Sequence, residues 1–199
     1  MIVRQICTGE IQENCYVIMD EETKQGFMVD PGDEGSRIAE LVDSLGVNLQ
    51  YIILTHGHFD HVGAVEYIAD KYNVPFYMSE IDEKWAEKVP TLFTKLRKAD
   101  GYLKDGDTLN CGNKEIKVYA TPGHTEGGLS FLVEDYLFTG DTLFRASIGR
   151  TDFPGGNFDK IIESIKTKLL CLSDEIVVCP GHGPSSTIAF EKERNPYFE

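Results

Sequence analysis

Four side chains of the kinds that bind metal ions lie within one short stretch of the chain. They are His56, His58, Asp60 and His61, in the pattern His-x-His-x-Asp-His. Imidazole nitrogens and carboxylate oxygens together suit zinc, manganese or iron, and closely spaced histidines are typical of metal ligands. The alternative is a polar loop whose histidines are hydrogen-bonded to backbone groups. The density of ligand-type residues favours a metal site.

The residues on either side of this stretch predict how its side chains are positioned. The apolar run Tyr51–Leu54 predicts a short buried strand, and residues 62–69 have the apolar periodicity of a helix. The candidate ligands therefore occupy a strand-to-helix turn. Such a turn curves the backbone tightly enough to aim several side chains at one point.

Three further candidates follow predicted strands in the second half of the chain. His124 and His182 each come directly after Pro-Gly, and Asp141 lies in Thr-Gly-Asp-Thr. Proline and glycine favour a sharp turn at the end of a strand. Functional loops on a rigid scaffold tend to converge on one cleft, so we expect these three side chains to meet the first four.

The seven candidates comprise all five histidines of the chain and two aspartates, too many for one tetrahedral zinc. Two metal ions about 3.5–4 Å apart, bridged by a carboxylate and a hydroxide, accommodate such a set. We therefore expect two divalent metal ions, with zinc first and iron or manganese as alternatives. Asp30, in the turn Asp-Pro-Gly, is either a simple turn residue or an acceptor that orients one of the histidines.

The composition narrows the class of protein. The 199 residues, 41% of them hydrophobic, predict one globular domain over residues 1–199. A net charge of -14 argues against nucleic acid or an anionic membrane as the main partner. We expect no signal peptide and no membrane span. The composition does not indicate an oligomeric state.

The five cysteines predict a cytoplasmic protein. They are odd in number, widely spread and without a Cys-x-x-Cys pair, which argues against a disulfide framework. A catalytic cysteine is the alternative to buried structural thiols. Nothing around any of the five singles one out as a nucleophile.

Helical periodicity is also present at Ser36–Leu45, at the charged segment Ile81–Ala99, which Val89-Pro90-Thr91 interrupts, and at Phe158–Leu170. The second of these carries a basic cluster, Lys95, Arg97 and Lys98. This cluster is either a solvated helix face or a lid that meets an anionic substrate. Further strands are expected at the following positions: Ile2–Cys7, Cys15–Met19, Gln25–Val29, Val74–Met78, Glu115–Ala120, Leu129–Val133, Tyr136–Thr139 and Ile176–Cys179.

The ordered set of histidines and aspartates resembles the metallo-β-lactamase superfamily. The stretches Thr121–Thr125 (TPGHT), Gly149–Gly156 (GRTDFPGG) and Glu193–Phe198 (ERNPYF) are similar to those of short bacterial glyoxalase II-like hydrolases. The resemblance covers nearly the whole chain. It implies an α/β fold, namely an αββα sandwich of two mixed β-sheets flanked by helices, with the metals at one rim.

The resemblance also implies roles for individual residues. His56, His58 and His124 would hold the first metal, and Asp60, His61 and His182 the second. Asp141 would bridge the two. Phe59 and Glu126 depart from the family pattern, which often has tryptophan and proline there, but neither is a ligand. The chain lacks the helical domain with which larger glyoxalase II enzymes bind glutathione, so selectivity for glutathione is not implied.

The expected function is hydrolysis of a small acyl thioester, S-lactoylglutathione or a related compound, by a metal-bridging hydroxide. Asp60 would help to orient this nucleophile. Arg145 and Arg150 are candidates for binding a substrate carboxylate, although Arg150 could instead fix the glycine-rich loop. The alternative is a persulfide dioxygenase of the same fold, in which a single iron would use His56, His124 and Asp141.

Overall fold

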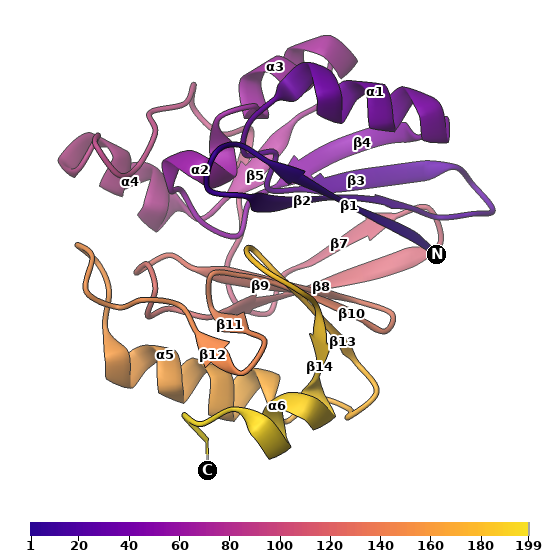
Figure 1. The fold of residues 1–199 in the computed structure, drawn as a ribbon. Coiled ribbons are helices and arrows are strands. Elements are labelled where there is room, and N and C mark those ends of the chain that lie inside the picture. Colours follow the sequence, from indigo (N-terminus) through magenta and orange to yellow (C-terminus); the bar gives the residue numbers. More distant parts are fainter. Residues whose placement is uncertain (199) are drawn as a thin grey trace.

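Two six-stranded sheets pack face to face in the computed structural model of the protein, which describes residues 1–198 (Figure 1). Helices cover the outer face of each sheet. The order of layers is therefore helix, sheet, sheet, helix, and the predicted αββα sandwich is confirmed.

The first sheet contains the N-terminal strands in their sequence order. Its first three strands are antiparallel neighbours, and the pairs β3–β4, β4–β5 and β5–β6 are parallel. The sheet is thus mixed, as expected. Its strands are β1 (Ile2–Thr8), β2 (Glu13–Met19), β3 (Gln25–Val29), β4 (Asn48–Ile53), β5 (Phe76–Met78) and β6 (Gly101–Tyr102).

The second sheet has the order β14-β13-β10-β9-β8-β7, in which only β10 and β13 are parallel neighbours. A short hairpin of β11 (Leu143–Phe144) and β12 (Ser147–Ile148) follows β10. The strands of this sheet are β7 (Thr108–Cys111), β8 (Lys114–Ala120), β9 (Leu129–Val133), β10 (Tyr136–Gly140), β13 (Val177–Pro180) and β14 (Ser186–Thr187).

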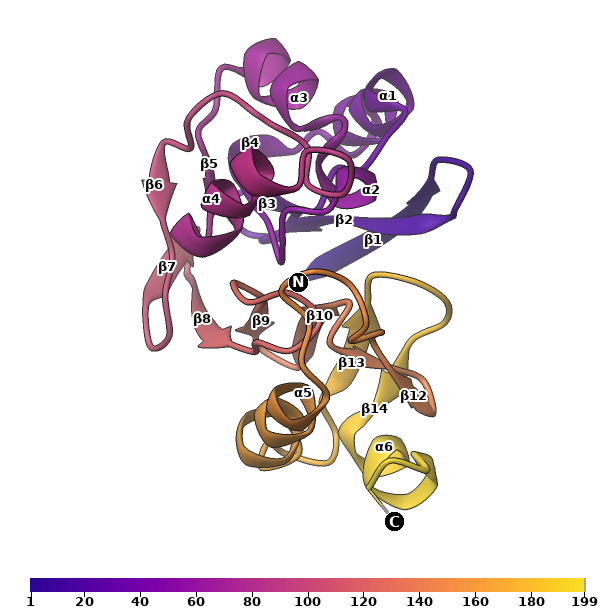
Figure 2. The ribbon, with the colours of Figure 1, turned by 90° about the vertical axis from the view of Figure 1, so that its left-hand side faces the viewer.

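Figure 1 places α1 and α3 above the first sheet and α5 and α6 below the second. In Figure 2 the molecule is viewed onto the end at which α2 and α4 lie. Among the described residues, no helix has the length and apolar character needed to cross a membrane. The helices are α1 (Gly35–Leu45), α2 (Phe59–Val62), α3 (Val65–Tyr72), α4 (Glu80–Lys88), α5 (Phe158–Ser164), the π-helical turn η1 (Ile165–Leu169) and α6 (Ile188–Arg194).

Three apolar clusters hold the layers together, and the central one joins the two sheets. It includes Phe27 and Ile53 from the first sheet and Phe131 and Phe138 from the second. The outer clusters pack α1 and α3 on the first sheet, and α5, η1 and α6 on the second. Burial on both faces explains why Cys15–Met19 of β2 and Tyr51–Ile53 of β4 are continuous apolar runs.

One helix is shorter than the sequence predicted. The helix in the segment Ile81–Ala99 ends at Lys88, next to the predicted interruption at residues 89–91, and the prediction of helix for residues 92–99 is wrong. Val89 has φ -134° and ψ 67°, outside the helical region, as is usual for a residue before proline. The segment that follows packs on the histidine turn instead, because Phe93 forms a β-bridge with His58.

Candidate metal centre

The structure brings the seven candidate ligands together from four loops at one rim of the sandwich. The loop and short helix after β4 carry His56, His58, Asp60 and His61, and the loops after β8, β10 and β13 carry the others. The strands β8, β10 and β13 run in the same direction, so their carboxyl ends meet at one edge. The sheet direction thus explains why His124, Asp141 and His182 converge.

The first group of ligand atoms belongs to His56, His58 and His124, which are all buried and lie within 4.8 Å of one another. His58 Nδ1 and His124 Nε2 are 2.9 Å apart. The opposite nitrogen of His124, Nδ1, is 2.8 Å from the backbone carbonyl of Arg150. A proton on Nδ1 donates to this carbonyl and leaves Nε2 free to face the centre.

The second group consists of Asp60, His61 and His182, whose ligand atoms also lie within 4.8 Å of one another. Asp60 Oδ2 is 3.1 Å from His182 Nε2 and 3.5 Å from His61 Nε2. His182 is held by a β-bridge between its backbone and Glu13, at the start of β2. The first and second sheets therefore meet at this group.

Asp141 lies between the two groups. Its Oδ1 is 3.4 Å from His61 Nε2 and 3.7 Å from His182 Nε2, while its Oδ2 is 3.5 Å from His124 Nε2. One oxygen thus faces the second group and the other faces the first. This is the placement that a carboxylate needs in order to bridge two metal ions.

Asp30 contacts His61 from behind the centre. Its Oδ2 is 2.9 Å from His61 Nδ1 and accepts a hydrogen bond from the Thr55 hydroxyl at 2.5 Å, and its Oδ1 accepts from the Thr55 N–H at 2.7 Å. The backbone of Asp30 is left-handed, with φ 50°. Asp30 is therefore both a turn residue and a hydrogen-bond partner of a candidate ligand.

Several polar atoms of the centre have no hydrogen-bond partner among the described residues, although they are buried. They are the Nε2 atoms of His56, His58 and His61 and the Oδ1 atom of Asp141. Such groups are costly to bury without a partner. Imidazoles and carboxylates gathered at one place are donors that zinc, iron and manganese accept, so this set of residues fits bound metal ions.

The electrostatics of the centre keep most donors in the form that binds metal. Burial lowers the pKa of His56 well below its usual value and that of His58 to about 3, so both rings are neutral at pH 7. Burial favours the protonated form of Asp141, but the neighbouring histidines, His61 first, hold the pKa of its carboxyl well below its usual value. Burial opposes charge on His61 too, yet the Asp141 and Asp30 carboxylates raise its pKa well above the usual value.

The two arginines that we expected to bind substrate are engaged with other groups. The Arg150 guanidinium donates to both oxygens of Asp152 at 2.7 Å and lies 3.7 Å from the centre of the Phe153 ring. Arg145 lies over the Phe190 ring at 4.1 Å. Their role in substrate binding stays a prediction, while the carbonyl of Arg150 contacts His124.

None of the five cysteines forms a disulfide, and none belongs to the ligand groups found in residues 1–198. Cys15, Cys111 and Cys179 are buried. Burial raises the pKa of the Cys111 thiol to about 11 and that of Cys179 to about 12. A raised thiol pKa disfavours the thiolate that a nucleophilic cysteine requires.

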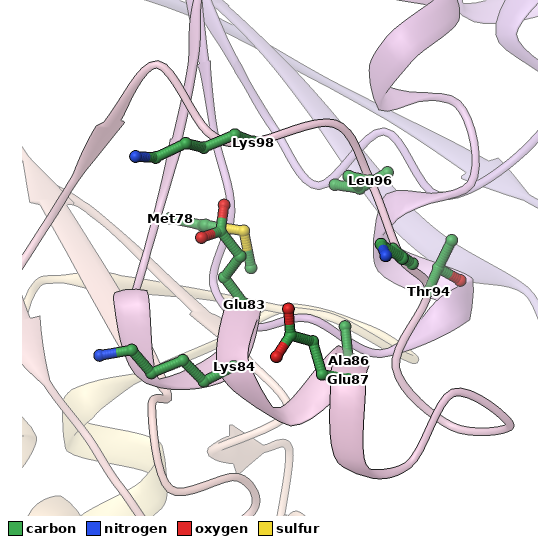
Figure 3. Close-up of a pocket in the computed structure, with 9 residues that line it drawn as sticks. Met78, Glu83, Lys84, Ala86, Glu87, Thr94, Leu96 and Lys98 are labelled. Atoms are coloured by element: carbon green, nitrogen blue, oxygen red, sulfur yellow. The ribbon is translucent and has the colours of Figure 1, made fainter.

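The basic cluster lies around a separate pocket of about 250 Å³ (Figure 3). Lys95 and Lys98 line this pocket together with Glu83 and Glu87 of α4, and no candidate ligand lines it. Arg97 instead forms an ion pair with Asp100 at 2.9 Å. The two lysines therefore share their pocket with two glutamates, the arginine is paired with an aspartate, and the pocket is separate from the candidate centre.

Sequence reasoning missed the residues that hold the histidine loops from the side of α4. Asp82 is completely buried and accepts hydrogen bonds from Gly57, in the loop of His56 and His58, and from Gly127, in the loop of His124. Phe93 lies against His58, with ring centroids 4.6 Å apart. An aspartate within a charged helix gives no signal of burial. For Phe93, the sequence offered one signal: Pro90 ends the helix and so frees the following residues to pack elsewhere.

The chain belongs to the metallo-beta-lactamase superfamily, since the model of this family matches residues 8–182. This match includes all seven candidate ligands. Among relatives of the chain, the hydroxyacylglutathione hydrolase GloC of Haemophilus influenzae is 38% identical over 208 aligned residues, covering 99% of this chain and 98% of the relative.

Three solved structures share this fold with the chain. The BLEG-1 B3 metallo-beta-lactamase is 34% identical with a TM-score of 0.92, and the alignment covers 99% of both chains. ETHE1 from Myxococcus xanthus is 33% identical with a TM-score of 0.86, covering 98% of this chain and 84% of that one. TTHA1623 in a di-iron-bound form is also 33% identical, with a TM-score of 0.84, covering 98% and 99%. Membership of this metallo-hydrolase superfamily confirms the predicted family.

Proposed function

We propose that the protein is a binuclear metal-dependent hydrolase of small acyl thioesters. The observation that carries the proposal is the convergence of seven ligand-type residues, which include four buried atoms without a hydrogen-bond partner in residues 1–198. His56, His58 and His124 would hold the first metal, Asp60, His61 and His182 would hold the second, and Asp141 would bridge them. The similarity to GloC supports a hydroxyacyl thioester such as S-lactoylglutathione as substrate.

Bound metal ions supply a water whose pKa is lowered toward about 7 and positive charge that stabilises a tetrahedral oxyanion. The protein's own residues prepare the site for this chemistry. Asp30 fixes the ring of His61 by accepting from its Nδ1–H, so that Nε2 faces the centre. The carbonyl of Arg150 does the same for His124.

Asp60 and Asp141 are the carboxylates that we assign to catalysis. Asp60 is half-buried at the edge of the centre, where it can accept a hydrogen bond from an attacking water and orient it. Asp141 has oxygens facing both groups of histidines. No protein nucleophile is required, which agrees with the raised pKa values of the buried thiols.

The metals are zinc in this proposal, with iron or manganese compatible with the same donors. The TTHA1623 structure in its di-iron-bound form supports two metals in this fold and shows that zinc is not the only metal to consider. We place the protein in the cytoplasm, a location that the five free thiols support.

Elemental analysis and a thioester assay on one sample test the proposal. Protein purified without added metal should contain close to two metal ions per chain and hydrolyse S-lactoylglutathione, and a chelator should abolish both. Metal-free protein that hydrolyses the thioester at the full rate would refute the proposal.

The same sample decides the alternative function. A persulfide dioxygenase would contain one iron, held by His56, His124 and Asp141, and would consume oxygen with glutathione persulfide. The gathering of Asp60, His61 and His182 into a second group favours the binuclear hydrolase instead. One iron per chain, oxygen uptake and no thioester hydrolysis would establish the dioxygenase.

A further inference from the structure

A carboxylate outside the proposed chemistry joins the two loops that carry the first group of histidines. Asp82 of α4 is completely buried. Its Oδ2 accepts hydrogen bonds from the Gly57 N–H at 3.0 Å and the Thr125 hydroxyl at 2.9 Å, and its Oδ1 accepts from the Gly127 N–H at 2.9 Å. Gly57 separates His56 from His58, while Thr125 follows His124. One side chain is therefore bonded to both loops.

Two of the three donors are glycines, and the packing requires them. A Cβ at Gly127 would lie 2.5 Å from Asp82 Oδ1 and 2.6 Å from the Ser79 hydroxyl. A Cβ at Gly57 would lie 3.1 Å from the Phe93 ring and 3.3 Å from Asp82 Cβ. A side chain at position 127 would therefore displace the carboxylate or its neighbour, and one at position 57 would push its neighbours away by a few tenths of an ångström.

A second contact from the same helix reinforces the first. The Trp85 indole N–H donates to Glu126 at 3.1 Å, in the loop that carries His124. Trp85 also stacks on Phe93, with centroids 6.0 Å apart, and Phe93 lies against the His58 ring. Figure 3 shows Glu83 and Glu87 of the same helix, which line a separate pocket.

We propose that Asp82 is a positioning residue that sets the spacing between His124 and the pair His56 and His58, and thereby the affinity of the first metal. This inference rests on the proposed metal-dependent function. The partners of Asp82 are loop groups rather than ligands. Metal–imidazole bonds of about 2.0–2.1 Å tolerate deviations of only about 0.2 Å, so small changes in loop spacing weaken binding.

The ionisation of Asp82 agrees with this role. Burial raises the pKa of its carboxyl to about 6, against the hydrogen bonds from Thr125, Gly57 and Gly127, which lower it. The group is therefore ionised at neutral pH despite its burial. An ionised carboxylate accepts all three hydrogen bonds at once and makes them stronger than neutral ones.

The test is a zinc titration of the metal-free full-length chain by calorimetry, for the wild type and Asp82→Asn. An asparagine keeps one oxygen but turns an amide N–H toward a backbone N–H, so at least one of the three hydrogen bonds is lost. We expect the affinity of one of the two zinc-binding events to fall about tenfold, while the affinity of the other changes less than twofold. Tenfold is the low end of the loss seen when a residue that orients metal ligands is replaced.

Asp20→Asn is the matched control. Asp20 is also a buried aspartate that accepts from a threonine hydroxyl, Thr23, at 2.7 Å and from two backbone N–H groups. The whole of β2 separates it from the centre. Asp20→Asn should leave both zinc-binding events unchanged. Wild-type zinc binding by Asp82→Asn, or parallel weakening of both events in the two variants, would overturn the inference.

A second pair of variants decides the question if Asp82→Asn does not fold. Thr125→Val removes one donor to Asp82 with little change of shape, whereas Thr125→Ser keeps the hydroxyl. We expect the valine variant to weaken the same zinc-binding event several-fold and the serine variant to match the wild type. Equal affinities in these two variants would overturn the inference. A wild-type chain that binds no zinc would instead refute the proposed function itself.

Discussion

Replacing Asp30 by asparagine should disable the second metal position while leaving the fold intact. Asp30 Oδ2 accepts from His61 Nδ1 at 2.9 Å, so Nε2 is the nitrogen that would give up its proton to bind a metal. In Asp30→Asn, the retained oxygen can stay with the Thr55 N–H. The amide nitrogen then donates to His61 Nδ1. His61 must carry its proton on Nε2, where it faces the metal.

The size of the effect follows from the alternatives open to the asparagine. It can rotate to restore the bond to His61 only by placing its N–H₂ group against the Thr55 N–H, which costs about 1–3 kcal/mol for an unsatisfied buried donor. Zinc affinity at the second position should therefore fall about 10- to 100-fold. Asparagine also tolerates the left-handed backbone at this position, so the free energy of unfolding should change little.

Calorimetric zinc titration and thermal unfolding of the metal-free protein measure the two quantities separately. Asp30→Ala leaves three buried donors unsatisfied and should lose about 3 kcal/mol or more of stability. Asp33→Asn, an exposed neighbour, is the control and should match the wild type. Two zinc ions bound at wild-type affinity by Asp30→Asn would refute the argument that Asp30 fixes the tautomer of His61.

Four further results are expected. Asp141→Ala should lower metal content and reduce kcat/KM for thioester hydrolysis at least 100-fold, because one carboxylate faces both groups of histidines; near-normal turnover would contradict its bridging role. Replacing all five cysteines together should leave kcat for thioester hydrolysis unchanged while lowering the melting temperature, because three of them are buried; loss of kcat in a folded variant would point to a thiol nucleophile. The metal-free protein should lose about 3 kcal/mol of unfolding free energy relative to Asp82→Asn as pH rises from about 3 to 7, since the raised pKa of Asp82 means that the folded state binds the extra proton; unfolding curves of both proteins across this range measure the difference, and parallel curves would contradict it. Lactoyl esters of glutathione and of a smaller thiol should have kcat/KM values within about tenfold, because the Arg150 guanidinium is already paired with Asp152; a preference of several orders of magnitude for glutathione would reveal a binding pocket for the thiol carrier.

The candidate ligands could be found from sequence because each occupies a local context with its own signal. His124 and His182 follow Pro-Gly at strand ends, and the first four share one dense motif. The directions of the strands then bring the loops together. This convergence follows from pairing between distant strands, such as β10 with β13, which local patterns suggest only through the resemblance to a known family.

The supporting residues could not be found in the same way. Asp82 lies among charged residues of α4, and only the packing of this helix against two loops shows that it is buried. Glu13 is similarly hidden: its side chain is buried 3.8 Å from His61 Nδ1, yet it reads as an ordinary polar residue before a strand. Strands of two residues, such as β11 and β14, are too short for alternation to be recognised.

The distribution of the ligands along the chain bears on when the centre can be completed during synthesis. The first sheet and its loops supply the histidines up to residue 61, whereas the second sheet supplies His124, Asp141 and His182. The first group of ligands is complete once His124 has emerged and β8 has formed. The second group also needs His182, which lies in the loop after β13.

The last ligand is also placed by the earliest part of the chain. His182 pairs through its backbone with Glu13, and the side chain of Asn14 donates to the carbonyls of Pro180 and Gly183 at 3.0 and 2.9 Å. The start of β2 and the loop after β13 must therefore have met before the second group can form. The first group of ligands needs residues only as far as His124, whereas the second group also needs the contact of His182 with β2.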